Sequence, residues 1–199
     1  MSFRSDFEHR DALLAAAIDE FVERGYDSAS INRILAEAGV SKGQLYHHFS
    51  SKEGLFLALV EWMLDQKAAW FEQHPVDAHD DLLTTIGIQI RASFAFAAAH
   101  PDIDRLSRAL LEERGHPIFA TVVSTFGFRP DSALGEMVDR ALDQGQIRSE
   151  LSPDLVRRFV LTTMTHLGDL LETGNPDALD DQIDQVLSIL RHGLHGAPD

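Results

Sequence analysis

Apolar residues recur at helical spacing along almost the whole of this 199-residue chain. In the first run, 10–24, they fall on one helical face at intervals of one, three and four residues: Leu13, Leu14, Ala17, Ile18, Phe21 and Val22. Gly25 follows this run, as is typical of a helix C-cap. Because no region shows strand-like alternation, the pattern predicts an all-α protein of about nine or ten helices.

Two short helices, Ile31–Ala38 and Lys42–His48, are predicted next, joined by the turn Gly39–Val40–Ser41. Two helices joined by a short turn that contains glycine form a helix-turn-helix, whose second helix enters the major groove of DNA. The second of these two helices is unusually polar, since only Leu45 and the adjoining Phe49 are placed to pack inward. Its pattern therefore predicts a helix that presents hydrogen-bonding side chains to a partner.

Serine residues stand where these helices should begin. Ser30 is placed to cap the helix 31–38 with its hydroxyl, and Ser41 forms a capping box with Gln44. A second capping box, Ser50 with Glu53, predicts the start of a long fourth helix that ends near residue 71. The first fifty residues thus form a compact three-helix pattern.

Glycine and proline divide the rest of the chain into further helices. Gly127 and Pro130 interrupt the apolar pattern that starts at Pro117, and Gly174 separates the last two helices. We expect these later helices to cover residues 81–99, 101–113, 117–127, 132–144, 152–174 and 175–193.

The stretch from Leu13 to Leu55 resembles the N-terminal domain of the TetR family of transcriptional regulators. The residues that carry the resemblance are Phe21, Gly25, Tyr26, Ser28, Ser30, Ile31, Ile34, Ala38, Gly39, Val40, Ser41, Lys42, Gly43, Leu45, Tyr46, His48, Phe49, Ser51, Lys52, Glu53 and Leu55. Beyond Leu55 the resemblance is one of length and helical content. It implies a helix-turn-helix DNA-binding domain over residues 1–50 and a helical effector-binding and dimerisation domain over residues 51–199.

The resemblance implies a ligand-responsive regulator, most commonly a repressor, that binds a palindromic double-stranded DNA operator as a homodimer. A small-molecule effector would release it by shifting the long helix 51–71 against the reading helix. The DNA-binding residues that this implies are Ser30, Ser41, Lys42, Gly43, Gln44, Tyr46, His47 and Lys52. An alternative is that the run Tyr46–Phe49 is a helix end with partly buried aromatic rings.

Each of these residues has a role suited to its chemistry. Tyr46, Lys52 and the Ser30 hydroxyl would contact phosphates, Gln44 could pair with adenine, and Lys42 could reach guanine or a phosphate. His48 is placed either to pack or to contact a phosphate. Three arginines are candidates for further backbone contacts: Arg4, Arg10 and Arg33.

The net charge of −15, from 17 basic and 32 acidic residues, at first argues against a nucleic-acid partner. The acid is unevenly spread, however, since residues 1–52 carry a net −2 and residues 53–199 a net −13. From Ala38 to Lys52 there are two lysines and no acid. Because exposed charges are screened beyond about 8 Å, the distant acid weakens DNA binding without preventing it. We expect weak nonspecific affinity and a shallow salt dependence.

The last two helices carry broad apolar stripes that predict a homodimer interface. Leu155, Phe159, Val160, Leu167, Leu170 and Leu171 form one stripe, and Leu179, Ile183, Val186, Leu187, Leu190 and Leu194 form the other. Aromatic and small residues of the middle helices suggest an apolar effector pocket with Trp62, Arg91, Phe94, His100, Phe119, Phe126, Thr163 and His166 as candidate lining residues. The alternative for both sets is packing within one chain.

Other classes of protein have little support in the sequence. There is no cysteine, no HExxH, GxSxG or phosphate-binding glycine motif, and the ten histidines lack metal-ligand spacing. We therefore expect no catalysis, no cofactor and no metal site, with an enzyme as the least favoured alternative. A metal-responsive regulator is a further alternative, in which His100 or His116 would meet other ligands in the fold. The chain shows no signal-peptide core and no continuous apolar run of about 18 residues, so we expect a cytoplasmic protein without a membrane partner. The competing prediction is a helical small-molecule-binding or interaction protein without operator activity.

Overall fold

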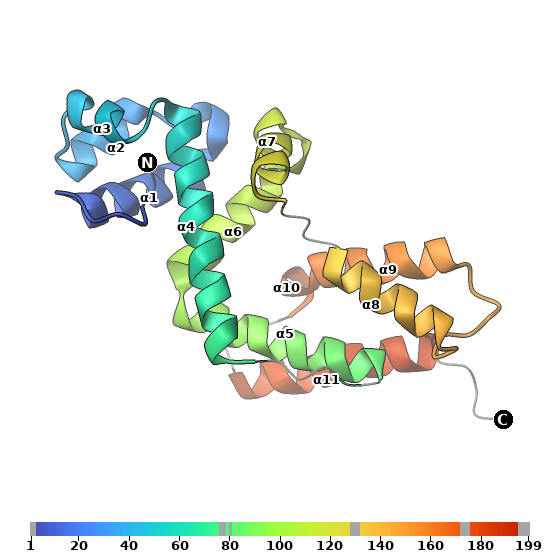
Figure 1. Cartoon of the computed structure of the whole chain (residues 1–199). Helices are drawn as coiled ribbons and strands as arrows, with labels where there is room; N and C mark the ends of the chain where they lie inside the picture. The colour runs from blue at the N-terminus through green and yellow to red at the C-terminus, as the bar shows by residue number, and fades with distance from the viewer. Residues whose placement is uncertain (1–2, 76–78, 80, 128–131, 172–175, 195–199) are drawn as a thin grey trace. The chain divides into compact units, whose positions relative to one another are not determined.

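The computed structural model describes residues 3–75, 79, 81–127, 132–171 and 176–194. These residues form helices and the turns that connect them, and none of them lies in a strand (Figure 1). The helices are α1 (Arg10–Ser28), α2 (Ile31–Ala38), α3 (Lys42–His48), α4 (Lys52–Gln73), α5 (Leu82–Ala99), α6 (Pro101–Glu112), α7 (Pro117–Phe126), α8 (Ser132–Asp143), α9 (Pro153–Thr165), α10 (Leu167–Leu170) and α11 (Pro176–Leu194). A 3-10 turn, η1 (Glu113–Gly115), follows α6. The predicted all-α fold is confirmed, since ten of these helices have seven residues or more and α10 is a single turn.

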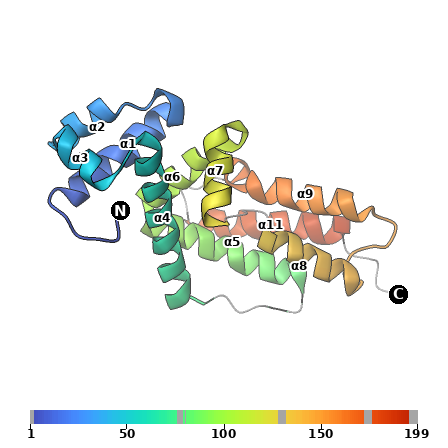
Figure 2. The ribbon, with the colours of Figure 1, turned by 45° about the horizontal axis from the view of Figure 1, so that its top comes forward.

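The chain divides into two compact units, and unit 1 comprises residues 1–74 and 96–128. Within it α1 packs against α2, α4 and α6, while α4 also packs against α6 and α7. Helices α1, α2 and α3 lie together beside α4 (Figure 2). The largest fully buried side chains of this unit come from α1, α2, α3, α4 and α6 and from the residues before α1: Phe3, Leu13, Phe21, Ile34, Leu45, Leu55, Leu59, Met63, Leu106 and Leu110.

Unit 2 comprises residues 75–95 and 129–199, and it has a separate apolar core. Helix α8 packs against α9, and the buried side chains include Ile86, Val138, Val160, Ile183 and Leu190. Gly87 lets α5 approach α11 closely, because a Cβ at this position would lie 2.7 Å from Cδ1 of Leu187.

Several predicted helix boundaries hold, and two caps differ. Gly25 breaks the helical geometry of α1 with a φ of 69°, as expected of a glycine at a helix end. Ser30 does occupy the N-cap position of α2, but its hydroxyl makes no capping hydrogen bond, so that prediction is wrong. Helix α4 is capped by Ser51, whose hydroxyl accepts from the Gly54 N–H, and not by Ser50.

The helix predicted over residues 152–174 is interrupted. Helix α9 ends at Thr165, His166 has non-helical angles (φ −102°, ψ 14°), and the single turn α10 follows. Gly168 lies two residues beyond this break, but the sequence prediction carried the helix through it to Gly174. The predicted ends at Gly174 and the interruption at Pro130 lie outside the described residues.

Helix α5 is long and apolar enough, by length and composition alone, to cross a membrane. The helix itself was predicted over residues 81–99. It was not singled out as an apolar span because Thr, Gln, Arg and Ser interrupt its apolar residues. Several of its large side chains are buried in the cores: Leu82, Leu83, Ile86, Ile90 and Phe96. This burial is typical of a core helix.

Candidate DNA-binding surface

Helices α2 and α3 form the helix-turn-helix that the sequence predicts. Helix α2 ends at Gly39, which adopts the left-handed conformation (φ 66°) at no steric cost. The Val40 N–H then donates to the Leu35 carbonyl at 3.1 Å and closes the turn. Val40, Leu45 and Phe49 are buried at 8%, 0% and 2% exposure, so the turn and α3 are anchored in the core of unit 1.

The start of α3 is fixed by a complete capping box. The Gln44 N–H donates to Ser41 Oγ at 3.2 Å, and the Ser41 N–H donates to Gln44 Oε1 at 2.9 Å. This reciprocal pair satisfies two backbone donors that a helix start would otherwise leave exposed. It also uses one lone pair of the Gln44 carbonyl oxygen, which leaves the second for pairing with adenine.

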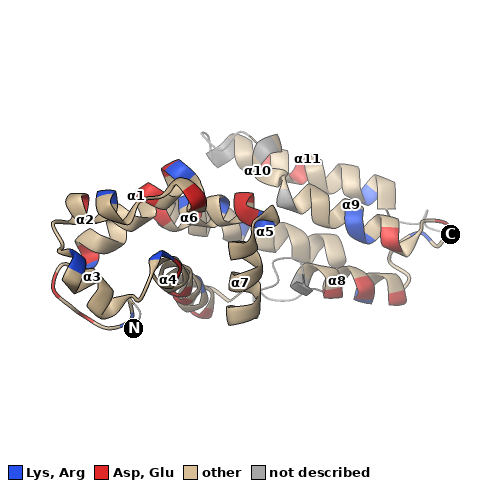
Figure 3. Cartoon of the chain, turned by 90° about the horizontal axis from the view of Figure 1, so that it is seen from above, with Lys and Arg blue, Asp and Glu red and all other residues tan. Residues whose placement is uncertain are grey.

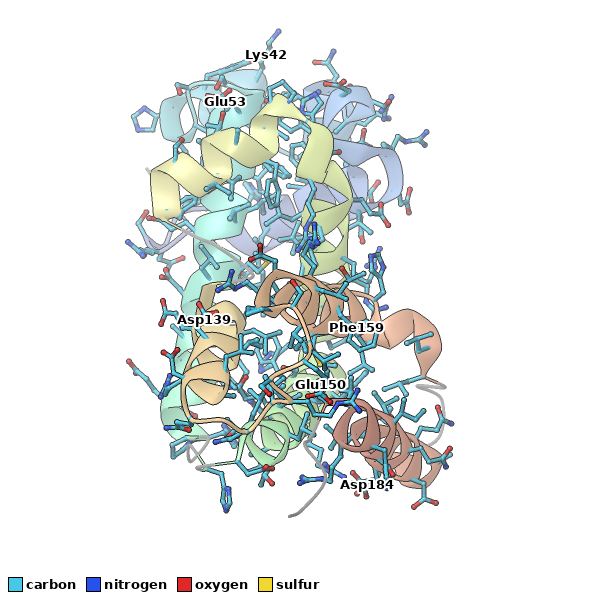
Figure 4. The ribbon with its side chains drawn as sticks, turned by 90° about the vertical axis from the view of Figure 1, so that its right-hand side faces the viewer. Lys42, Glu53, Asp139, Glu150, Phe159 and Asp184 are labelled. Carbon is cyan, nitrogen blue, oxygen red and sulfur yellow. The ribbon has the colours of Figure 1, made fainter. Side chains whose placement is uncertain are left out.

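The outward face of α3 is polar and exposed. Ser41, Lys42, Gly43, Gln44 and His47 are all exposed, and a Cβ at Gly43 would meet no other atom within 4 Å. Lys42 projects outward from the end of unit 1 (Figure 4). Acidic residues are present on helices of both units (Figure 3), but none lies between Ala38 and Lys52.

The aromatic residues at the end of α3 divide between surface and core. Tyr46 is 44% exposed, and the Lys42 ammonium lies 5.9 Å from its ring centroid. His47 is exposed, whereas the half-buried His48 ring stacks on Phe7 with centroids 4.2 Å apart. The partly buried rings of the alternative prediction are therefore found at His48 and Phe49, while Tyr46 and His47 are exposed.

Lys52 lies at the first turn of α4 and binds backbone of the preceding helices. Its ammonium donates to the carbonyls of Asp27 at 2.9 Å and Ala29 at 3.1 Å, and it lies 4.8 Å from the Tyr26 ring centroid. An ammonium has three donors, so one is left for a phosphate oxygen. Ser30 is half-buried beside this junction.

The three arginines suggested as extra DNA contacts all have partners within the chain. Arg33 pairs with Glu20, and this hydrogen bond lowers the pKa of Glu20 despite the opposing effect of burial. The Arg10 guanidinium donates to the Phe3 carbonyl at 2.7 Å. Arg4 pairs with Asp65 on α4.

A contact that the sequence did not suggest joins the end of α6 to the last turn of α1, beyond Gly25. Glu113 Oε1 accepts from the Tyr26 N–H at 2.7 Å, and His116 Nε2 lies 3.1 Å from Asp27 Oδ1. His116 Nδ1 accepts from the Ile118 N–H, so in this tautomer Nε2 carries the proton donated to Asp27. The corner between α6 and α7 is thereby attached to the DNA-binding helices.

The predicted effector residues lie in different units. Trp62, Phe119 and Phe126 pack on the core of unit 1, whereas Phe94 packs on that of unit 2. His100 lies against Phe96 in unit 1, with ring centroids 4.8 Å apart.

The other three predicted effector residues belong to unit 2. Arg91 pairs with Asp180 and Asp184 of α11 and lines a groove of about 380 Å³ between α5 and α11. Thr163 is half-buried on α9, and His166 is exposed at its end.

A cation near the aromatic residues of unit 1 was missed by the sequence prediction. The Lys67 ammonium lies 5.9 Å from the Phe96 ring centroid. Burial lowers the pKa of Lys67, and the negative charge of Asp104 partly opposes this shift. The sequence could not predict the burial of Lys67, because a single lysine in a helical pattern is typical of a solvated side chain.

The predicted dimer stripes are only partly used within the chain. Val160, Leu167, Leu171, Ile183, Leu190 and Leu194 are buried in unit 2. Four large apolar residues remain exposed on α9, α10 and α11: Leu155 (55%), Phe159 (49%), Leu170 (64%) and Ile189 (70%). Phe159 is marked on α9 in Figure 4.

Comparison with known families gives one match, to the model described as bacterial regulatory proteins of the tetR family, over residues 13–59. This range contains α2, the turn, α3 and the first turns of α4. The match therefore coincides with the helix-turn-helix and the residues that anchor it.

Similar proteins fall into two groups by coverage. The HTH-type transcriptional activator FasR of Mycolicibacterium smegmatis is 46% identical over 66 residues, which span 33% of this chain and 30% of FasR. The HTH-type transcriptional repressor AcnR of Corynebacterium glutamicum is 25% identical over 185 residues and 92% of both chains. The HTH-type transcriptional repressor KstR2 of Rhodococcus jostii is 25% identical over 93% of this chain and 90% of its own.

Solved structures share the fold over the full length. A TetR family transcriptional regulator from Chloroflexus aurantiacus superposes with a TM-score of 0.80 at 24% identity, covering 98% of this chain and 97% of the other. The ketosteroid transcriptional regulator KstR2 of Mycobacterium tuberculosis gives a TM-score of 0.66 at 24% identity, with coverage of 98% and 99%.

Proposed function

Because this chain belongs to the TetR family of transcriptional regulators, we propose that it represses transcription by binding a palindromic operator as a homodimer. A small-molecule effector would release it from DNA. The observation that carries the proposal is the exposed polar face of α3, held in place by the buried Leu45 and Phe49. A helix with this division of polar and apolar residues is suited to the major groove.

The exposed residues of α3 supply the contacts in this proposal. Lys42, Gln44 and His47 would face base edges, and Tyr46 would contact a phosphate, with Ser41 and Gly43 close to the backbone of the DNA. Ser30 and Lys52 would add phosphate contacts beside α3. Gln44 Oε1 already accepts from the Ser41 N–H, so pairing with adenine would use the second lone pair of this oxygen and the side-chain amide N–H.

A dimer is needed because one seven-residue helix reads few base pairs. Two copies would place their reading helices in half-sites about 34–36 Å apart, or a multiple of this spacing. The exposed apolar residues of α9, α10 and α11 support an interface through the last helices.

Residues 51–199 would bind the effector and residues 1–50 the DNA. An effector that prefers the DNA-incompetent state would shift α4, whose first turn is bonded to the carbonyls after α1 through Lys52. Four of the candidate pocket residues lie in unit 1, where they would contact the effector: Trp62, Phe119, Phe126 and His100. We further propose that the protein acts in the cytoplasm and catalyses no reaction.

Footprinting on the DNA that flanks the gene for this protein tests the proposal. We expect protection of two symmetric half-sites whose centres lie one helical turn, or a multiple of it, apart. Absence of any protected site at low salt would contradict operator binding. A promoter-fusion assay on the same DNA separates repression from activation, which the name of FasR makes the competing outcome.

A further inference from the structure

The residues before α1 form a folded N-terminal arm, Phe3–His9. The Phe3 side chain is fully buried, at 0% exposure. The Arg10 N–H donates to the Phe7 carbonyl at 3.1 Å, and His9 adopts the left-handed conformation (φ 64°) where the arm meets α1. The Arg10 guanidinium donates to the Phe3 carbonyl at 2.7 Å and closes the arm on itself.

The apolar residues of the N-terminal arm pack on the end of α3. The Phe3 and Phe49 ring centroids lie 5.0 Å apart, and the Phe7 and Phe49 centroids lie 6.1 Å apart. Phe7 also stacks on His48, the last residue of α3. The arm therefore covers the C-terminal end of the reading helix from one side.

The next residue of the arm binds the middle of α4. Arg4 Nε and Nη2 donate to the two carboxylate oxygens of Asp65 at 2.6 and 2.7 Å, and Nη1 lies 3.1 Å from Glu61 Oε1. A bidentate pair of this kind has a defined geometry that a single contact lacks. The Arg4 hydrogen bond lowers the pKa of Asp65, so the pair is ionised at neutral pH.

Two polar contacts of α4, one made by Lys52 and one made to Arg4 of the arm, are far apart along the helix. Asp65 lies 13 residues after Lys52, the first residue of α4, which corresponds to about 20 Å along the helix at 1.5 Å per residue. Lys52 joins the first turn of α4 to the end of α1. Arg4 joins the arm, and with it the end of α3, to a later turn of the same helix.

We propose that the N-terminal arm positions the reading helix, by holding the end of α3 through Phe3 and Phe7 while Arg4 binds Asp65 and Glu61 on α4. Arg4, Phe3 and Phe7 are positioning residues, and the DNA is contacted by α3. This inference rests on the proposed function, since it concerns how α3 is oriented for an operator. A displacement of α4 near Asp65 would be passed to α3 through the arm.

Asp65→Asn distinguishes positioning of α3 from direct phosphate contact by Arg4, because the two roles predict opposite changes in operator affinity. Removing an acidic charge should strengthen or preserve DNA binding if Arg4 contacts phosphates directly. If the arm positions α3, the same variant loses roughly threefold to tenfold in operator affinity while its affinity for nonspecific DNA is unchanged. Operator affinity that is unchanged or higher in Asp65→Asn would overturn the proposal.

Asp102→Asn is the matched control, because the exposed Asp102 pairs with Arg105 three residues away within α6. It removes the same charge and should leave operator affinity unchanged. The double variant Arg4→Asp with Asp65→Arg should regain most of the affinity that Arg4→Asp loses. A double variant no better than Arg4→Asp would exclude the pair as the connection.

Hydrogen exchange separates the failure of this inference from the failure of the proposed function, because it needs no DNA. The Phe49 N–H donates to the Leu45 carbonyl at 2.7 Å, and its exchange reports the end of α3. Exchange of the amides of residues 45–49 should be several-fold faster in Asp65→Asn than in the parent and in Asp102→Asn. Equal exchange in all three proteins would overturn the positioning role whether or not an operator is found.

Discussion

Single side chains connect parts of this chain that are distant in sequence. The Lys52 ammonium bonds two carbonyls more than twenty residues earlier, and Glu113 bonds the Tyr26 N–H from the end of α6. Each contact satisfies backbone groups that the end of a helix leaves without an intrahelical partner. At this scale the DNA-binding helices are held by polar contacts around an apolar core.

Lys52→Met keeps the apolar stem of the side chain and removes the charged donor. We expect the free energy of unfolding to fall by about 1–2 kcal/mol, because the carbonyls of Asp27 and Ala29 lose a charged hydrogen-bond donor. Urea denaturation measures the change. Lys42→Met is the control at an exposed lysine and should stay within about 0.5 kcal/mol of the parent; equal values for both variants would contradict this role of Lys52.

Helix starts show how far local sequence determines an element. The capping box of α3 was predicted correctly because Ser41, Gln44 and the following apolar residue suffice to form it. Two adjacent serines precede α4, however, and the choice of Ser51 over Ser50 accompanies the contacts of Lys52 with a turn more than twenty residues away. The burial of Phe3 likewise depends on packing against Phe49, which is distant in sequence, so no local pattern encodes it.

The candidate site also contains residues whose environment local sequence could predict and residues whose partners it could not. The exposure of Lys42, Gln44 and His47 could be predicted, because it depends on helical periodicity and on two apolar anchors nearby. The partners of Arg4 and Arg33 could not, because an isolated arginine gives no indication of which carboxylate it will meet.

Asp81 gives the first turn of α5 a cap that depends on pH. Burial raises its pKa, but hydrogen bonds from the N–H and hydroxyl of Thr84 and the pair with Arg191 outweigh this and lower the pKa to about 2. Since the folded pKa lies below the ordinary value of 3.8, the stabilisation is complete above pH 4 and is lost as the pH falls towards 2.

Asp81→Ala should therefore lower the free energy of unfolding by about 1 kcal/mol at pH 7. The difference from the parent should shrink between pH 4 and pH 2, where the parent also loses its carboxylate. Thermal denaturation of both proteins over this range measures it. A difference that stays constant with pH would show that the charge of Asp81 contributes nothing to the cap.

For the chain as a whole, the exposed apolar surface supports the proposed dimer, and the distribution of charge is compatible with DNA binding. The acid that gives the chain its net charge of −15 lies mostly after residue 52, away in sequence from the reading helix. Exposed apolar residues are grouped on α9, α10 and α11, where the sequence predicts the dimer interface. Two copies together would supply the second reading helix.

Phe159→Glu places a charge within this proposed interface. Because Phe159 is 49% exposed, the variant should fold, but burying the new carboxylate against a partner costs several kcal/mol. Sedimentation should show a monomer where the parent is a dimer at the same micromolar concentration. Ile88→Glu, at an exposed apolar residue of α5, should leave the dimer intact; an unchanged dimer in Phe159→Glu would place the interface elsewhere.

The operator affinity of Tyr46→Ala shows whether α3 reads DNA. Tyr46 is 44% exposed, so its truncation should leave the fold and the dimer unchanged, as circular dichroism and sedimentation would verify. Titration of the footprinted operator should show a loss of at least about tenfold relative to the parent, as expected when a phosphate contact is removed from each copy of a dimer. Equal affinities of Tyr46→Ala and parent would contradict the assignment of α3 as the DNA-reading helix.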